Sequence, residues 1–229
     1  MKFIHEKVEG LDFELEAVTT ETGRTYLTPK GNRYNSITTI LKPYNQHIIE
    51  NWKEAVGEEE AKRVSGIASR RGEALHLACE KYLLNELNDF KIRTMMPNIK
   101  ELFLQLRPIL DESVGKIYSI EQPLYSDELQ VAGRVDLIAE WNGKISIVDY
   151  KTSGKYKDES DIANYFMQCT AYAIMFEELT GIPIDQIVIA MAVVNENKPL
   201  VFVREKKDYI EQLNYFVELN RESLHLKLS

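Results

Sequence analysis

The sequence predicts an α/β fold with a mixed central β-sheet that is flanked by helices and preceded by a helical region. Residues 131–151 read VAGRVDLIAEWNGKISIVDYK, and Asn142-Gly143 between two β-branched runs is the strongest short-range signal for a β-hairpin. Both faces of this hairpin are apolar, so we expect other elements to cover both sides. The elements run as helices, three strands, helix, two strands and helix, which is typical of helices packed around a mixed sheet.

The N-terminal half predicts short strands followed by helices. Strands are expected in FELEAV, residues 13–18, and TYLTP, residues 25–29. Ser36 is placed to cap a helix in SITTILKPY, which Pro43 stops. Further helices are expected over residues 46–56, over residues 58–87, and between Pro97 and Pro108.

The C-terminal half predicts most of the sheet. A strand over residues 116–126 precedes the hairpin, and a helix from Ser160 to Thr180 follows it and ends at Gly181. Two strands, over residues 186–194 and 199–205, come before an amphipathic helix over residues 207–226. We expect one domain with N-terminal strands in 1–35, a helical region in 36–115 and the main core in 116–229.

Composition excludes several classes of protein. No apolar run approaches the roughly 18 residues of a membrane span, and the start MKFIHEKVEG matches neither a secretory signal nor a mitochondrial presequence. Two cysteines are expected to be free and buried in helices, which implies a reducing compartment, and they cannot supply a four-cysteine cluster. The net charge of −8 argues against a DNA reader held mainly by phosphate contacts.

Basic residues nevertheless gather locally. For each cluster, an ordinary solvent-exposed face is the alternative to a nucleic-acid-binding patch. The two clusters are Lys62, Arg63, Arg70 and Arg71, and then Lys151, Lys155 and Lys157.

The hairpin brings two carboxylates together. With a two-residue loop, Trp141 pairs with Lys144, and counting outward places Asp136 opposite Asp149. Cross-strand Cβ atoms lie about 4.5–5.5 Å apart, where like charges destabilise the sheet. Aspartates solvated at a sheet edge are the alternative, but a divalent cation would turn the repulsion into a ligand set. Lys151 falls on the same face as Asp149 because side chains alternate along a strand.

Two pairs of helical residues could complete such a site. His76 and Glu80 are four residues apart beside the buried stripe of RRGEALHLACEKYL, so they point the same way. They are either a surface pair or further metal ligands. Gln168 and Tyr172 are also four apart, and are either a core tyrosine with a polar neighbour or a pair that contacts phosphate or positions Lys151.

These motifs, in this order, resemble the PD-(D/E)XK nuclease superfamily, and more narrowly its RecB-like exonuclease branch. GRVD, VDYK, RGEALH and QxxxY carry the resemblance, which covers roughly residues 34–195 and is closest to the mitochondrial genome maintenance exonuclease group and its phage and bacterial relatives. The resemblance implies a restriction-endonuclease-like core and one or two Mg²⁺ or Mn²⁺ ions, without the iron–sulfur cluster of some members.

The resemblance also implies roles for individual residues. Asp136 and Asp149 would bind metal with His76, and Glu80 and Glu121 are further expected ligands. Lys151 would orient the attacking water and stabilise charge on the phosphate, while Gln168 and Tyr172 would support substrate and lysine. The expected substrate-binding residues are Arg70, Arg71, Ser36, Thr152, Lys155 and Tyr156, and the candidate stacking residues are Tyr34, Trp52, Tyr156 and Tyr165.

The expected function is a metal-dependent DNA exonuclease that prefers single-stranded ends, with the helical region as an arch or wall over the strand. A structure-specific or nicking endonuclease, and a non-catalytic nucleic-acid-binding protein on the same scaffold, are the alternatives. Expected partners are single-stranded DNA and proteins of replication or recombination, with no membrane. The expected location is the cytoplasm of a bacterium or of a phage-infected host cell.

Overall fold

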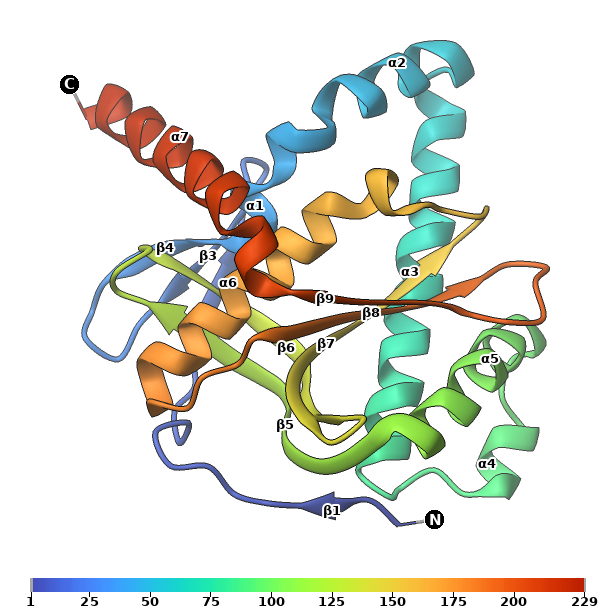
Figure 1. The fold of residues 1–229 in the computed structure, drawn as a ribbon. Coiled ribbons are helices and arrows are strands. Elements are labelled where there is room, and N and C mark those ends of the chain that lie inside the picture. The colour runs from blue at the N-terminus through green and yellow to red at the C-terminus, as the bar shows by residue number, and fades with distance from the viewer. Residues whose placement is uncertain (1, 229) are drawn as a thin grey trace.

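The computed structural model describes residues 2–228, with side chains described through Leu224. Nine strands form one mixed sheet, in which the path β2-β3-β4-β6-β7-β8-β9 is joined by β5, which pairs with β6 and β1 (Figure 1). The strands are β1 (Ile4–His5), β2 (Glu16–Thr19), β3 (Arg24–Leu27), β4 (Arg33–Ser36), β5 (Val114–Ser126), β6 (Val131–Trp141), β7 (Lys144–Ser153), β8 (Gln186–Val193) and β9 (Leu200–Glu205).

Helices cover both faces of this sheet, which confirms the predicted fold class (Figure 1). The α-helices are α1 (Ile37–Ile40), α2 (Gln46–Val56), α3 (Glu58–Leu83), α4 (Asp89–Arg93), α5 (Pro97–Ser113), α6 (Ala163–Thr180) and α7 (Ile210–Leu228). Three 3₁₀ turns separate some of them: η1 (Lys42–Asn45), η2 (Glu159–Ile162) and η3 (Lys206–Tyr209).

The hairpin of β6 and β7 forms in the predicted register. Trp141 pairs with Lys144, and the ladder continues to Leu137 opposite Val148. Asn142 and Gly143 have φ of 52° and 79°, as a type I′ turn requires. Beyond the hairpin, β7 pairs with β8 in parallel and β8 pairs with β9 antiparallel, so the sheet is mixed.

Two apolar layers enclose the hairpin. Ile138 and Ile147 belong to the core under α6 and α7, whereas Leu137, Trp141 and Val148 belong to the core under α3 and α5. Both faces are therefore buried, as predicted. Val135 packs in the α6 core although Leu137, two residues further along the same strand, packs under α3 and α5.

Helix α2 and the first half of α3 extend beyond the sheet (Figure 1). No residue of α2 is buried, and Ala61 is the one buried residue of α3 before Leu75. From Leu75 onward, α3 buries an apolar stripe against the sheet. The projecting part is called the α2–α3 arm below.

Several predicted boundaries are wrong for local reasons. Helix α3 ends at Leu83 rather than at residue 87, because Asn85 takes a left-handed conformation with φ of 62°. Helix α5 continues through Pro108 to Ser113, because the buried Leu106 and Leu110 hold the helix to the core on both sides of the proline. The cap after β7 is Asp158 rather than Ser160, and it starts η2, so that α6 begins at Ala163.

One predicted helix start and one predicted helix end are confirmed, whereas three short elements were not predicted. Ser36 caps α1 through a hydrogen bond from the Thr39 N–H, and Gly181 ends α6 with φ of 73°. Strands β1 and β4 and helix α4 were not predicted, since elements of two to five residues show no periodicity. No helix in residues 2–228 is both long enough and apolar enough to cross a membrane.

Candidate metal centre

The site forms where β6 and β7 separate. Pairing between them stops at Leu137 and Val148, one residue before Asp136 and Asp149. Beyond that point β7 stays paired with β8 through Ser153. The side chain of Asp136 accepts a 2.8 Å hydrogen bond from the backbone N–H of Tyr150, which no longer takes part in the hairpin ladder. The prediction that the two aspartates form a cross-strand pair of the ladder is therefore wrong. They are instead neighbours at the point where the strands split.

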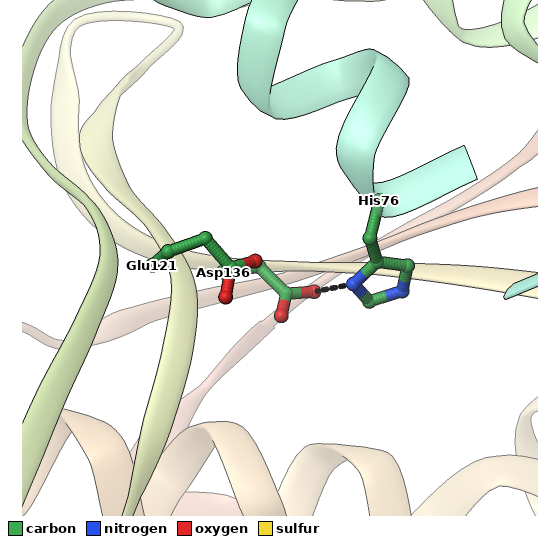
Figure 2. A group of neighbouring side chains, drawn as sticks. All are labelled: His76, Glu121 and Asp136. Atoms are coloured by element: carbon green, nitrogen blue, oxygen red, sulfur yellow. Dashed lines mark ion pairs between the residues drawn. The ribbon is translucent and has the colours of Figure 1, made fainter. Parts of the chain in front are cut away.

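Three side chains from three elements converge at this split (Figure 2). His76 comes from α3, Glu121 from β5 and Asp136 from β6, and their ligand atoms all lie within 4.8 Å of one another. His76 Nδ1 lies 3.4 Å from Asp136 Oδ2. Within the described chain, neither Asp149 nor Glu80 belongs to this group of three.

The environment sets different charges on these groups. Burial raises the pKa of Asp136, but the charge of His76 and the Tyr150 N–H outweigh this effect, so its pKa lies below the ordinary value. Burial lowers the pKa of His76, and the charge of Asp136 reverses that shift, so its pKa lies above normal. Asp136 is therefore held ionised beside an imidazole that protonates easily in the absence of metal.

Glu121 reaches the group through an unusual backbone. Its φ of 51° is left-handed, and the β5–β6 ladder skips it, with Ile120 and Gln122 paired on either side. Arg134 holds this bend by donating a 2.6 Å hydrogen bond to the Glu121 carbonyl. Burial, together with the charge of Asp136, raises the pKa of Glu121 to about 7. A non-glycine residue in this conformation next to buried carboxylates is typical of a functional site.

Asp149 and Lys151 form an ion pair beside the group. Asp149 is 1% exposed, and no described residue donates a hydrogen bond of good geometry to either of its carboxylate oxygens. Burial raises the pKa of Asp149 to about 6, with Asp136 adding to the shift and Lys151 opposing it. The Lys151 ammonium also lies 4.9 Å from the centre of the Tyr165 ring.

The donor set fits a divalent cation. A buried carboxylate without hydrogen bonds is costly, and a hard cation is the partner that would satisfy it. Asp136 and Glu121 offer oxygen and His76 offers nitrogen, while the buried Asp149 carboxylate lies beside this group. An imidazole nitrogen suits Mn²⁺ better than Mg²⁺. Glu80 lies one turn beyond His76 on α3, where its charge contributes to the raised pKa of Glu121.

Gln168 and Tyr172 on α6 form the expected pair. The Gln168 amide donates a 3.2 Å hydrogen bond to the Tyr172 hydroxyl. Tyr172 is buried against Gly133 of β6, where an added Cβ would come within 2.6 Å of the ring. Burial raises the pKa of Tyr172, and the charges of Asp149 and Asp136 add to this increase.

The loop after Lys151 faces the α2–α3 arm. Lys155 and Lys157 share a 510 Å³ cleft with Tyr44, His47, Ile48 and Ile49 from η1 and α2. Tyr156, between the lysines, is 66% exposed. The cleft joins basic side chains to apolar and aromatic surface.

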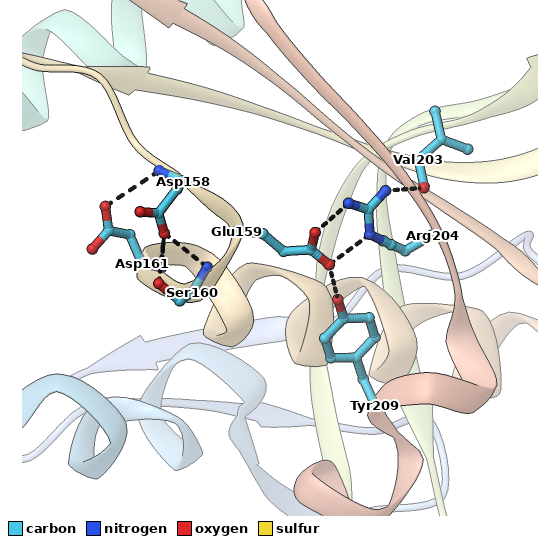
Figure 3. A network of polar contacts seen from close by, with 7 residues as sticks. All are labelled: Asp158, Glu159, Ser160, Asp161, Val203, Arg204 and Tyr209. Carbon is cyan, nitrogen blue, oxygen red and sulfur yellow. Dashed lines mark hydrogen bonds and ion pairs between the residues drawn. The ribbon is translucent and has the colours of Figure 1, made fainter.

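This loop is anchored at its far end (Figure 3). Glu159 of η2 forms an ion pair with Arg204 of β9, and the Tyr209 hydroxyl donates a 3.1 Å hydrogen bond to the same carboxylate. Asp158 and Asp161 close η2 through a reciprocal capping box. These contacts fix where residues 154–158 leave β7 and enter η2.

The remaining predicted substrate residues differ in position. Thr152 lies beside Gly72 of α3, at 3.9 Å from the site of an added Cβ. Arg70 is exposed on the arm, and Arg71 lines a separate 660 Å³ cavity with α5 and the β8–β9 turn. Ser36 is buried and its hydroxyl caps α1, so its surroundings are those of a structural residue.

Among the candidate stacking residues, Tyr34 is buried in a core with Tyr26 and donates its hydroxyl hydrogen to Asp127, so no stacking surface is left there. Trp52 is half-buried on α2, and Tyr165 lies under the Lys151 ammonium. Sequence reasoning missed Arg134 and the Tyr150 N–H. The arginine in GRVD was a visible signal, but its target, a backbone carbonyl, depends on the Glu121 bend.

Comparison with known proteins places this site in context. A family model described as the PD-(D/E)XK nuclease superfamily matches residues 41–225. The mitochondrial genome maintenance exonuclease 1 of Xenopus tropicalis is 26% identical over 158 residues, covering 66% of this chain and 44% of that protein. The protein of the same name from Mus musculus is 27% identical over 136 residues, covering 55% of this chain and 39% of that protein. The chain thus spans less than half the length of these curated relatives.

A solved structure from Eubacterium rectale, named as an exonuclease candidate, aligns with a TM-score of 0.48 and 15% identity. The alignment covers 67% of this chain and 65% of that chain. The match of the family model over most of the sequence establishes the family: the chain belongs to the PD-(D/E)XK nuclease superfamily.

Proposed function

We propose that the protein is a metal-dependent DNA exonuclease that acts on single-stranded ends. The observation that carries this proposal is the strand split, where His76, Glu121 and Asp136 converge and the buried ion pair of Asp149 and Lys151 lies beside them. A fold has no structural reason to bury so many carboxylates, whereas metal-assisted phosphodiester hydrolysis needs them.

Each residue has a proposed role. Asp136, Asp149, Glu121 and His76 would hold one or two Mg²⁺ or Mn²⁺ ions. When bound, such ions lower the pKa of coordinated water and stabilise charge on the scissile phosphate. The Lys151 ammonium, fixed between Asp149 and the Tyr165 ring, would donate to the phosphate and orient the attacking water. Gln168 and Tyr172 would keep α6 in contact with the split strands.

The cleft between the loop and the arm supports a single-stranded substrate. Single-strand binding sites combine basic side chains that follow the backbone with aromatic surfaces on which bases stack. Lys155 and Lys157 line this cleft together with the aromatic Tyr44, and the exposed Tyr156 stands between the two lysines in the chain. The names of the two curated relatives support the exonuclease part of the proposal.

A structure-specific endonuclease remains the second candidate, and substrate shape distinguishes the two. The test incubates the protein with end-labelled linear and with circular single-stranded DNA, with Mn²⁺ or with EDTA. We expect shortening of linear DNA from an end, intact circles and no cleavage in EDTA. Linearised circles would favour the endonuclease, and metal-independent cleavage would contradict the mechanism.

The same assay tests Lys151. Removing one group that stabilises transition-state charge lowers the rate by about 10²–10³-fold, so Lys151→Ala should lose at least that much cleavage. Lys144→Ala, at the exposed hairpin turn, is the matched control and should cleave normally. Full activity of Lys151→Ala in a folded protein would refute the site. A protein that binds single-stranded DNA yet cleaves neither substrate would be the non-catalytic alternative.

A further inference from the structure

A shallow apolar groove of 320 Å³ is lined by residues of α3, α4 and α5 and of the loops between them. Helices α4 and α5 lie beside the C-terminal part of α3 (Figure 1). Its α3 side is formed by Ala74, Leu77, Ala78 and Lys81, which follow the i, i+3, i+4, i+7 spacing of one helical stripe. The opposite side is formed by Leu87, Lys91, Met95, Met96 and Ile99. Seven of these nine residues are apolar, so the groove offers little to a polar ligand.

Large apolar side chains remain exposed around this groove. Leu77 is 48% exposed and Met96 is 69% exposed, and Phe90 of the adjoining α4 is 68% exposed. Single exposed apolar residues are ordinary, but a contiguous group around a groove marks an interaction site. Methionines are typical of such surfaces because their flexible side chains adapt to a partner.

The charges at the groove define the partner. Its two charged lining residues are both lysines, Lys81 and Lys91, in a chain whose net charge is −8. Lys91 lies at the rim, where its ammonium donates a 3.0 Å hydrogen bond to the Glu86 carbonyl. Two ammonium groups beside an apolar surface are complementary in charge and polarity to a ligand whose apolar side chain is flanked by carboxylates.

The groove is separate from the metal centre. At 3.6 residues per turn, the groove stripe of α3 lies about 130° around the helix from His76 and Glu80. An occupant of the groove would therefore leave the metal group accessible. It would also contact α3 over the turns that pack on the sheet, which are the most firmly held part of that helix.

We infer that this groove docks an acidic amphipathic segment of a partner protein, with an aliphatic or aromatic side chain between α3 and α5 and Asp or Glu side chains at Lys81 and Lys91. Apolar anchors with i, i+3 or i+4 spacing are the usual way in which a peptide helix occupies such a groove. This inference is independent of the proposed nuclease activity.

The test is a selection from random 16-residue peptides displayed on phage and panned on the full chain. Counter-selection uses Met96→Lys, which places a charge in the groove at an exposed position. We expect enriched peptides to combine Leu, Ile, Phe or Trp with several Asp or Glu residues. An enriched set without net negative charge, or no enrichment over the counter-selected variant, would overturn the inference.

Fluorescence anisotropy with an enriched, labelled peptide supplies the quantitative arm. Reversing two exposed charges in Lys81→Glu/Lys91→Glu should weaken binding by about tenfold or more. Lys144→Glu is the control and should bind as the parent does, and all variants should keep their DNA cleavage rate. Equal affinity for the parent and the double variant would contradict the inference. Sedimentation that shows a dimer lost in Met96→Lys would instead assign the groove to a second copy.

Discussion

Asp136 and Asp149 lie at the same split but have opposite charge preferences. The fold holds Asp136 ionised through His76 and the Tyr150 N–H, whereas burial and the charge of Asp136 make ionisation of Asp149 unfavourable despite its ion pair with Lys151. From the sequence alone the two aspartates look equivalent. In the structure Asp136 accepts a hydrogen bond from a backbone N–H, whereas Asp149 accepts none of good geometry and is the unsatisfied carboxylate. The unsatisfied one is the group that gains most from a cation.

Neutralising these two residues should therefore change the metal-free stability in opposite directions. Asp149→Asn should raise the melting temperature in EDTA at neutral pH, because it removes an unfavourable buried charge. Asp136→Asn should lower it, because His76 loses its counter-charge. Differential scanning fluorimetry measures both, and a large loss for Asp149→Asn would show that its ion pair with Lys151 outweighs its burial.

Metal binding should weaken as the pH falls. Asp149, with a pKa of about 6, and Glu121, with a pKa of about 7, must each lose a proton before ligating a cation. Both values lie above the ordinary carboxyl values of 3.8 and 4.5, so without metal the folded protein binds these protons more tightly than the unfolded chain. These groups therefore lower metal-free stability as the pH rises from about 4 to 7.

The Mn²⁺-induced increase in melting temperature, compared at several pH values, tests this linkage. It should grow from about pH 5.5 to pH 7.5 as the two carboxyls lose their protons. A shift that stays constant with pH would argue that neither carboxyl binds the ion.

At the scale of elements, the site depends on α6 packing closely on β6. Gly133 has room for no side chain, because a Cβ there would meet the Tyr172 ring at 2.6 Å. This contact holds α6 beside the strand that carries Asp136.

Gly133→Ala should destabilise the protein by about 1–3 kcal/mol through overpacking, measured by urea unfolding. Adding Tyr172→Leu should recover part of this loss, since the smaller side chain leaves space. Gly154→Ala, where nothing lies within 4 Å of the added Cβ, is the matched control. Strictly additive effects of the first two substitutions would contradict the proposed contact.

The element pattern could be predicted where periodicity is long. The hairpin register follows from Asn142-Gly143, and α2 has the predicted bounds because its sequence is flanked by clear signals. The strand split could not be predicted. The turn sequence sets the register of the hairpin ladder, but the residue at which pairing stops depends on tertiary packing. The Glu121 bend depends in the same way on Arg134, whose partner is a backbone carbonyl.

At the scale of the whole molecule, the N-terminal strands and the C-terminal core belong to one sheet. Strand β4 pairs in parallel with the start of β6, so residues 33–36 are tied directly to the strand that carries Asp136. The division of the chain as a single domain stays a prediction. Residues at the start of the α2–α3 arm and residues of the loop after Lys151 line opposite sides of the proposed DNA cleft.

The sequence could indicate the site residues through motif order but not their distances. His76, Glu121 and Asp136 are far apart in the chain and meet because α3 packs across β6 and β7. The burial of Ser36 and Tyr34 could not be predicted, because β4, which carries both, is too short to show a periodic pattern. The apolar groove between α3 and α5 likewise arises only from tertiary packing.

Anomalous X-ray diffraction from crystals soaked in Mn²⁺ tests the central claim most directly, namely that the strand split is a cation site. We expect an anomalous peak in contact with Asp136 and with at least one of Asp149, Glu121 and His76. The peak should disappear in Asp136→Asn. No peak at the split, in crystals of protein that cleaves DNA with Mn²⁺, would contradict the account.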